Sequence, residues 1–363
     1  MDKLLKERGL VWRQFWTILI CVACHYGSPT AAGTRPEPPP PIARLLPPEL
    51  NGEPDVISLL EQLFLTPRIS LLASEWFTAF DKAANVPYLL LFDALDTGFG
   101  NSEPERERRR IAIEGLCSLL IQQSDSPNLK LKVVLREDIW RKLRFENKSH
   151  LFGRYVNLDW NDQTAYYKIV LKQALRSTAF QRELGTVVKS VDSSRVDEWG
   201  DREVVLAWNF LVGERMKGEK TAFTRNWVWN RLADANNDHT PRYLLQLFKE
   251  VAVQESIEQQ KIPYDRSILK PRSFIKALPA VSTQALDALR EEFPELEKLL
   301  DKLREIGRTP VASEELADRG ELVVLGREVG LLGIYEGTED KVERYRVPEI
   351  YRYALGMTRK GQA

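Results

Sequence analysis

One short stretch limits what this chain can fold into: residues 87–98, with the sequence PYLLLFDALDTG. A proline precedes a run of apolar residues, and the run ends in two carboxylates, Asp93 and Asp96. A short apolar run between polar residues is typical of a strand buried on both faces of a parallel sheet. In α/β proteins, ligands bind at the carboxyl ends of such strands. We therefore expect Asp93 and Asp96 to lie at a ligand-binding edge.

Two further strands are predicted downstream. Residues 129–136, LKLKVVLR, begin with alternating apolar and polar side chains and end in an apolar run that Arg136 closes. Residues 154–158, within RYVNLDW, are expected to form the third strand. A long helix is predicted at about 104–123, and REDIWRKL begins a short one. This alternation of strands and helices predicts a parallel α/β core over residues 55–160.

Residues 1–27 allow three interpretations. The sequence CVACH at 21–25 has the C-x-x-C-H spacing of c-type haem attachment. The apolar run FWTILICVAC, which follows several basic residues, is similar to a secretory signal but is too short to span a bilayer as a helix. Large apolar residues at helical spacing instead predict an amphipathic or buried core helix, which is the interpretation that we favour.

The remaining segments differ in character. Residues 28–54 are rich in proline, which predicts an extended linker or a surface loop. The pattern over 161–262 is helical throughout, and Thr240 followed by Pro241 is a strong start signal for its last helix. Within residues 271–358, a helix at about 282–305 precedes two strand-like runs that flank the polar tip EGTEDK. Helices followed by such a hairpin are the outline of a winged-helix domain.

Four residues fall where a nucleotide site would need them. Asp93 could hold magnesium, and Asp96 could orient or deprotonate an attacking water. Arg136 ends a strand beside them and would lie near a terminal phosphate, whereas Arg242 opens a helix from which a guanidinium could reach bound phosphates. Each residue also has an ordinary structural explanation, because strand-end aspartates often cap turns and arginines often pair with nearby carboxylates.

The segments LLLFDALD, LKVVLREDIWRKL, YVNLDW and TPRYLLQLF, in this order, resemble bacterial P-loop ATPases of the STAND and KAP type. These are relatives of AAA+ proteins, and many are linked to anti-phage defence. The resemblance covers about residues 85–358. It implies an α/β fold with a partial P-loop NTPase parallel sheet, followed by an all-helical lid and a C-terminal winged-helix domain.

The same resemblance implies ATP and magnesium as cofactors. It makes Asp93 the Walker B residue that binds magnesium, Arg136 a sensor of the γ-phosphate and Arg242 the arginine of the lid. Many relatives place a second acid directly after the first, whereas this chain has Ala94 there. This departure weakens the assignment of Asp96 as the catalytic acid.

The phosphate-binding loop of such ATPases is missing from the sequence. No G-x-x-x-x-G-K-[ST] motif occurs, and the most similar stretch, GERMKGEKT at 213–221, has an extra residue before its lysine and follows the Asp93 strand instead of preceding it. The resemblance would place the loop ahead of the segment LVWRQFWTILI. We therefore expect a truncated or degenerate relative that binds ATP weakly and hydrolyses little or none.

Charge limits the classes of partner. The chain has 52 Lys and Arg against 52 Asp and Glu, so it has no global basic field that would attract nucleic acid or anionic lipid. We expect a cytoplasmic switch or interaction module with protein partners or a second copy of itself. The alternative is a winged-helix DNA-binding regulator, which the acidic residues of 282–300 disfavour. A third alternative, an exported or membrane-anchored protein, rests on residues 1–34 alone.

Overall fold

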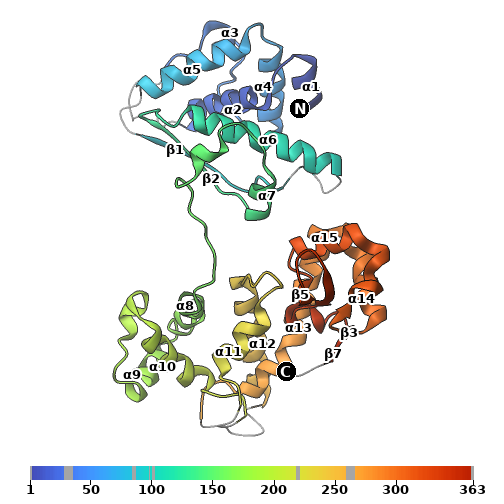
Figure 1. The fold of residues 1–363 in the computed structure, drawn as a ribbon. Helices are drawn as coiled ribbons and strands as arrows, with labels where there is room; N and C mark the ends of the chain where they lie inside the picture. Colours follow the sequence, from blue (N-terminus) through green and yellow to red (C-terminus); the bar gives the residue numbers. More distant parts are fainter. Residues whose placement is uncertain are drawn as a thin grey trace. The chain divides into compact units, whose positions relative to one another are not determined.

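The computed structural model describes residues 2–27, 36–83, 87–97, 99, 103–217, 221–258 and 266–360 (Figure 1). The chain divides into two compact units, Met1–Val156 and Asn157–Ala363. The boundary lies close to the end of the predicted α/β core at residue 160. The predicted helical region and the C-terminal region instead fall in one unit and share one hydrophobic core.

The first unit is mixed α/β, with a small sheet and several helices. Its helices are α1 (Asp2–Glu7), α2 (Trp12–Gly27), α3 (Pro40–Ala43), α4 (Glu53–Leu65), α5 (Ile69–Ala83), α6 (Glu103–Gln122), α7 (Glu137–Lys142) and the 3-10 helix η1 (Lys148–Leu151). Its strands are β1 (Tyr88–Phe92) and β2 (Leu129–Val133). These bounds confirm the predicted first two strands, the long helix between them and the short helix after the second.

The two strands are parallel, with Tyr88 opposite Leu129 and Phe92 opposite Val133. Only one face of this sheet is packed: alternate side chains of β1 join the core formed with α2 and α5, whereas Leu89 and Leu91 are 61% and 65% exposed. The prediction of a strand buried on both faces is therefore wrong. A run of leucines gives no sign of which side chains are covered, because that depends on where the helices pack.

The predicted third strand is also wrong. Residues 155–160 form no regular structure, and Val156 and Leu158 are 82% and 83% exposed. The segment lies at the boundary between the two units. Its β-branched and aromatic residues favour an extended backbone, but a strand also needs a neighbour to pair with, and pairing depends on context more than on propensity.

The N-terminal helix α2 is a core helix, as predicted. Trp16 and Ile20 are buried, and the Trp16 indole Nε1 donates to the Ala112 carbonyl of α6 at 2.7 Å. Cys21 and Cys24 are buried in the same core, and burial raises the pKa of both thiols, that of Cys24 to about 11. Thiols enclosed in this way do not fit a covalent haem site, so the haem interpretation is wrong.

The proline-rich region is only partly a loop. Residues 28–35 lie outside the described residues, but the short helix α3 places Ile42 in the core, and the Tyr26 hydroxyl donates to the Pro47 carbonyl at 2.6 Å. The prediction of a linker is therefore wrong for this part. Proline is tolerated in the first turn of a helix, where its missing N–H has no partner to lose, and α3 begins with two prolines.

Within the described residues, no individual helix combines the length and the apolar character needed to cross a membrane. The pair α4 and α5 meets both measures only when taken together, and the two helices are bent by 117° at their junction.

The second unit begins with a run of helices. These are α8 (Gln163–Ala174), α9 (Thr178–Val187), η2 (Ser193–Glu198), α10 (Asp201–Val212), α11 (Thr224–Leu232) and α12 (Pro241–Glu258). The prediction of a helical region over 161–262 is confirmed for the described residues, including the start of its last helix at Pro241. Aromatic residues form the centre of this region: Trp208 packs against Tyr167 with ring centroids 4.2 Å apart, and its indole nitrogen donates to the Thr224 hydroxyl at 2.8 Å.

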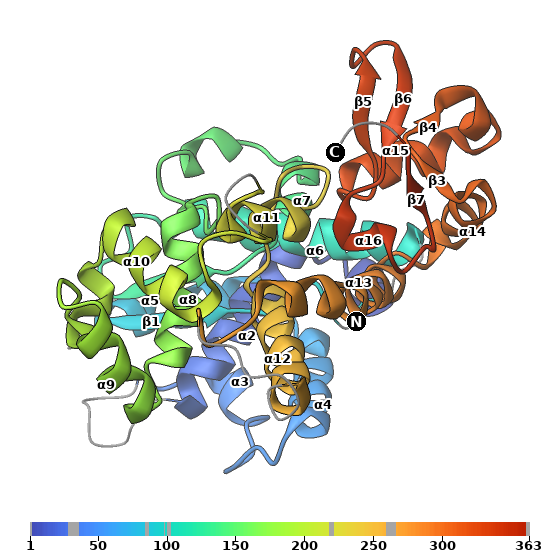
Figure 2. The ribbon, with the colours of Figure 1, turned by 90° about the horizontal axis from the view of Figure 1, so that it is seen from below.

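The rest of the second unit combines helices with short strands. The helices are α13 (Pro271–Glu292), η3 (Pro294–Leu296), α14 (Glu297–Ile306), η4 (Ser313–Arg319), α15 (Gly320–Glu328) and α16 (Glu349–Arg352). The strands are β3 (Arg308–Thr309), β4 (Val311–Ala312), β5 (Gly333–Gly337), β6 (Val342–Arg346) and β7 (Thr358–Arg359). Strands β5 and β6 form the predicted hairpin within an antiparallel sheet of order β4-β6-β5, and β3 pairs with β7 (Figure 2).

One expectation for this region is corrected. The single helix predicted at 282–305 is two helices, because α13 ends at Glu292 and α14 begins at Glu297. Pro294 explains the break, since proline disfavours helical geometry in the residue before it.

Candidate functional site

The carboxyl ends of β1 and β2 carry the predicted acidic and basic residues. The pairing continues one step beyond the strands, where the Val134 amide donates to the Phe92 carbonyl at 2.8 Å, so both chains leave the sheet at the same edge. Asp93 follows β1 directly, and Arg136 precedes α7. The prediction that these two residues follow neighbouring strand ends at one edge is confirmed.

A short turn after β1 brings Asp96 to Arg136. The Asp93 carboxylate accepts from the Ala94 amide at 2.8 Å, and Ala94 has a left-handed backbone with φ 55°. The Thr97 hydroxyl then donates to the Ala94 carbonyl at 2.8 Å. This turn places Asp96 Oδ2 3.8 Å from Arg136 Nη1.

Neither partner of this ion pair is buried. The side chains of Asp96 and Arg136 are 31% and 40% exposed, and a pair this accessible contributes little to stability. The carbonyl of Asp96 accepts from Arg109 of α6 at 3.1 Å, so a second guanidinium lies close to the turn. The strand-end cluster, meaning Asp93, Asp96 and Arg136, thus offers two carboxylates and a guanidinium to solvent.

Arg242 belongs to the second unit. It is exposed in the first turn of α12, as the sequence predicts from the start of that helix at Pro241. Three of the four predicted site residues, Asp93, Asp96 and Arg136, therefore lie together at one edge of the sheet. The fourth, Arg242, belongs to the other unit.

The strand-end cluster fits magnesium and ATP only in part. Among the described residues there is no group of three or more His, Cys, Asp or Glu arranged to hold a metal ion. Magnesium in nucleotide sites commonly takes one or two carboxylates together with phosphate oxygens and water, so Asp93 could supply one ligand. The phosphates in turn need backbone donors and a lysine, and the sequence has no such loop. We therefore derive no catalytic step from this cluster.

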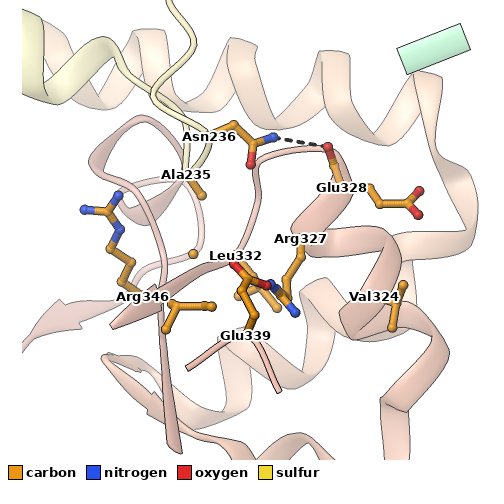
Figure 3. Close-up of a pocket in the computed structure, with 10 residues that line it drawn as sticks. Ala235, Asn236, Val324, Arg327, Glu328, Leu332, Glu339 and Arg346 are labelled. Atoms are coloured by element: carbon orange, nitrogen blue, oxygen red, sulfur yellow. Dashed lines mark hydrogen bonds and ion pairs between the residues drawn. The ribbon is translucent and has the colours of Figure 1, made fainter. Parts of the chain in front are cut away.

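A hollow of about 420 Å³ in the second unit is a second candidate (Figure 3). Its walls come from α15, from the β5–β6 hairpin and from the turn between α11 and α12. Arg327 pairs with Glu339 at the hairpin tip, and the Asn236 amide donates to the Glu328 carbonyl at 3.1 Å. In Figure 3 the guanidinium of Arg346 points away from the Arg327–Glu339 pair. The hollow thus holds two arginines and two glutamates, a balance that favours no particular charge of ligand.

Asp234 lies in the turn that forms one wall of this hollow. Its carboxylate accepts from the amides of Asn236 and Asp238, each at 2.8 Å. The Ala235 amide donates to the Gly330 carbonyl at 2.8 Å, so this turn is joined to the end of α15. Burial raises the pKa of Asp234 to about 6, against an ordinary value of 3.8, and the two backbone donors only partly offset this.

No sequence pattern predicts this hollow. Its residues come from the turn at 234–238, from α15 and from the hairpin, which are far apart in the chain. The one available signal was the polar run DANND at 234–238, which is typical of a turn. A turn signal does not reveal what the turn packs against.

Comparison of the chain with known proteins gave no relative: no protein-family model, no curated protein and no solved structure matches it.

Proposed function

We propose that this chain is an ATPase-derived interaction module of the STAND and KAP kind, which keeps the Walker B edge of a P-loop sheet and has lost ATP turnover. The observation that carries the proposal is the edge itself. β1 and β2 are parallel neighbours: Asp93 directly follows β1, and Arg136 lies three residues after the end of β2. The ion pair between Asp96 and Arg136 joins the two strand ends. Ligand sites of α/β proteins lie at such edges.

The open face of the same sheet supports a role in protein contacts. Leu89 and Leu91 are exposed on this face, and Val134, which follows β2, is 48% exposed. Large apolar side chains gathered on an exposed surface are typical of interaction sites. We propose protein partners or a second copy of the chain as the occupants, in the cytoplasm, with anti-phage defence as the biological setting that the resemblance suggests.

A winged-helix domain is the finer assignment that we propose for the region after α13. The element order supports it: α14, then β4, η4 and α15, then the β5–β6 hairpin, with sheet order β4-β6-β5. In that arrangement α15, and not residues 282–300, would be the helix that reads DNA. Its exposed residues include Glu321, Val324 and Glu328, which offer DNA no positive charge. A DNA-binding regulator therefore stays the less favoured function.

Binding of ATP with magnesium tests the proposal. The melting temperature of the purified chain should rise by no more than about 1–2 °C at millimolar ATP, because affinity without the glycine-rich loop is weak and the stabilisation grows only with the logarithm of ligand over Kd. Asp93→Ala should remove whatever shift exists, and Asp340→Ala, an exposed carboxylate of the hairpin tip, should leave it unchanged. A large shift that survives Asp93→Ala would contradict the proposed use of this edge.

A further inference from the structure

Three arginines and one carboxylate come from neighbouring elements of the second unit. Arg231 is the next-to-last residue of α11, Arg352 ends α16, and Arg359 lies in β7. Glu349 of α16 is the carboxylate: Arg352 donates to it through Nε at 3.0 Å and Nη2 at 2.8 Å, and Arg359 Nη1 lies 3.8 Å from it. Helices α11 and α16 pack against each other, so the group is built from contacting elements.

Two of these guanidinium groups lack a full partner. The Arg352 guanidinium is occupied, since it binds Glu349 through two nitrogens and donates to the Met357 carbonyl at 2.8 Å through the third. Glu349 is therefore neutralised by Arg352, and Arg359 reaches it only at a long distance. Arg359 is about half exposed, with 47% of its side chain accessible.

Arg231 is the unusual member. Its guanidinium lies 4.4 Å from the ring centre of Trp227, and the residue is half-buried. Within the described part of the chain it donates no hydrogen bond and forms no ion pair. Burial lowers its pKa, and so do the charges of Arg359 and Arg352, against the opposing effect of Glu349. A guanidinium has five N–H donors, so Arg231 can bind an acceptor that comes from outside the chain.

We propose that Arg231 and Arg359, beside the Glu349–Arg352 pair, form a binding site for a phosphate-type oxyanion. Such a dianion would neutralise the two charges that Glu349 leaves uncompensated. It would also accept the hydrogen bonds that Arg231 lacks, for which the planar guanidinium suits paired oxygens. The stacking of Arg231 on Trp227 holds its guanidinium in one orientation before the anion arrives. This site is separate from the strand-end cluster and is carried by different residues.

The test is binding of inorganic phosphate to the full chain, measured by isothermal titration calorimetry at low ionic strength and pH 8, without magnesium. Arg231→Met keeps the apolar stem over Trp227 and removes the donors, and it should weaken binding at least about tenfold. Arg202→Met is the matched control, because Arg202 is an exposed arginine of α10 in the same unit, and it should bind phosphate as the wild type does.

A stability measurement separates this role from a purely structural one. In phosphate-free buffer Arg231→Met should melt no lower than the wild type, since it removes an uncompensated charge, and added phosphate should raise the melting temperature of the wild type alone. A parallel titration with ADP shows whether the site takes a nucleotide phosphate or free phosphate. Loss of binding of either ligand in Arg231→Met supports the site. Absence of phosphate binding by the wild type, or equal binding by Arg231→Met, would overturn it.

Discussion

Gly115→Ala should destabilise the first unit by about 2–3 kcal/mol, the largest effect that we expect from a methyl group added to a described glycine of this unit. Gly115 lies in α6 where this helix meets the start of α2. A Cβ atom there would lie 2.7 Å from Trp12 Cβ and 2.8 Å from the Arg13 amide nitrogen. Both neighbours are at or next to the backbone of α2, so they cannot turn aside as a flexible side chain would. The helices must separate, which also loosens the packing of Trp16 against α6.

The matched control is Gly185→Ala. Gly185 lies inside α9, and a Cβ atom there would have no neighbour within 4 Å. Alanine should therefore stabilise by about 0.5–1 kcal/mol through its higher helix propensity. Urea unfolding followed by far-UV circular dichroism measures both variants. A midpoint for Gly115→Ala equal to or above that of the wild type would contradict the close contact of α2 and α6.

Asp234→Asn should stabilise the second unit at pH 8 by roughly 1–2 kcal/mol and have little effect at pH 4. Because the pKa of Asp234 is raised to about 6 by burial, the folded chain holds this proton at a pH where the unfolded chain has lost it. The stability that Asp234 contributes is thus present at low pH and is lost as the pH rises from about 4 through 6. Asparagine stays neutral and can still accept from the amides of Asn236 and Asp238.

Other charged groups around Asp234 set the size of this effect. The Asp238 carboxylate raises its pKa further, and Arg346 of β6 lowers it. The phenols of Tyr243 and Tyr351 face it from α12 and α16, and their pKa values are raised mainly by burial. Urea midpoints of wild type and variant across this pH range give the measurement, with Asp340→Asn as a control. A constant difference at every pH would rule out titration of Asp234 as the cause.

The fold could be predicted from the sequence where a pattern is local. The helix containing Trp16, the strand ending at Phe92 and the hairpin around the polar tip all follow from periodicity and turn residues, and the structure has each of them. Predictions failed where the outcome depends on distant partners. Residues 154–158 have the composition of a strand but no neighbouring strand, and Leu89 and Leu91 look buried in the sequence because nothing local records which face a helix covers.

The candidate sites, too, could be predicted only where the pattern is local. Asp93 and Arg136 could be placed at one edge because parallel strands that pair must end on the same side. The 3.8 Å ion pair of Asp96 with Arg136 depends on the left-handed backbone of Ala94. Alanine rarely adopts this conformation, so the sequence does not predict the turn. The arginines around Glu349 come from three elements that only the tertiary structure brings together.

ATP hydrolysis by the purified full chain with magnesium tests the central claim most directly. We expect phosphate release from the wild type no faster than from Asp93→Ala. The reason is that a carboxylate and an arginine at a strand edge recognise phosphate, whereas affinity and alignment in P-loop enzymes come mainly from the glycine-rich loop and its lysine. Robust hydrolysis by the wild type that Asp93→Ala abolishes would contradict the claim that turnover has been lost.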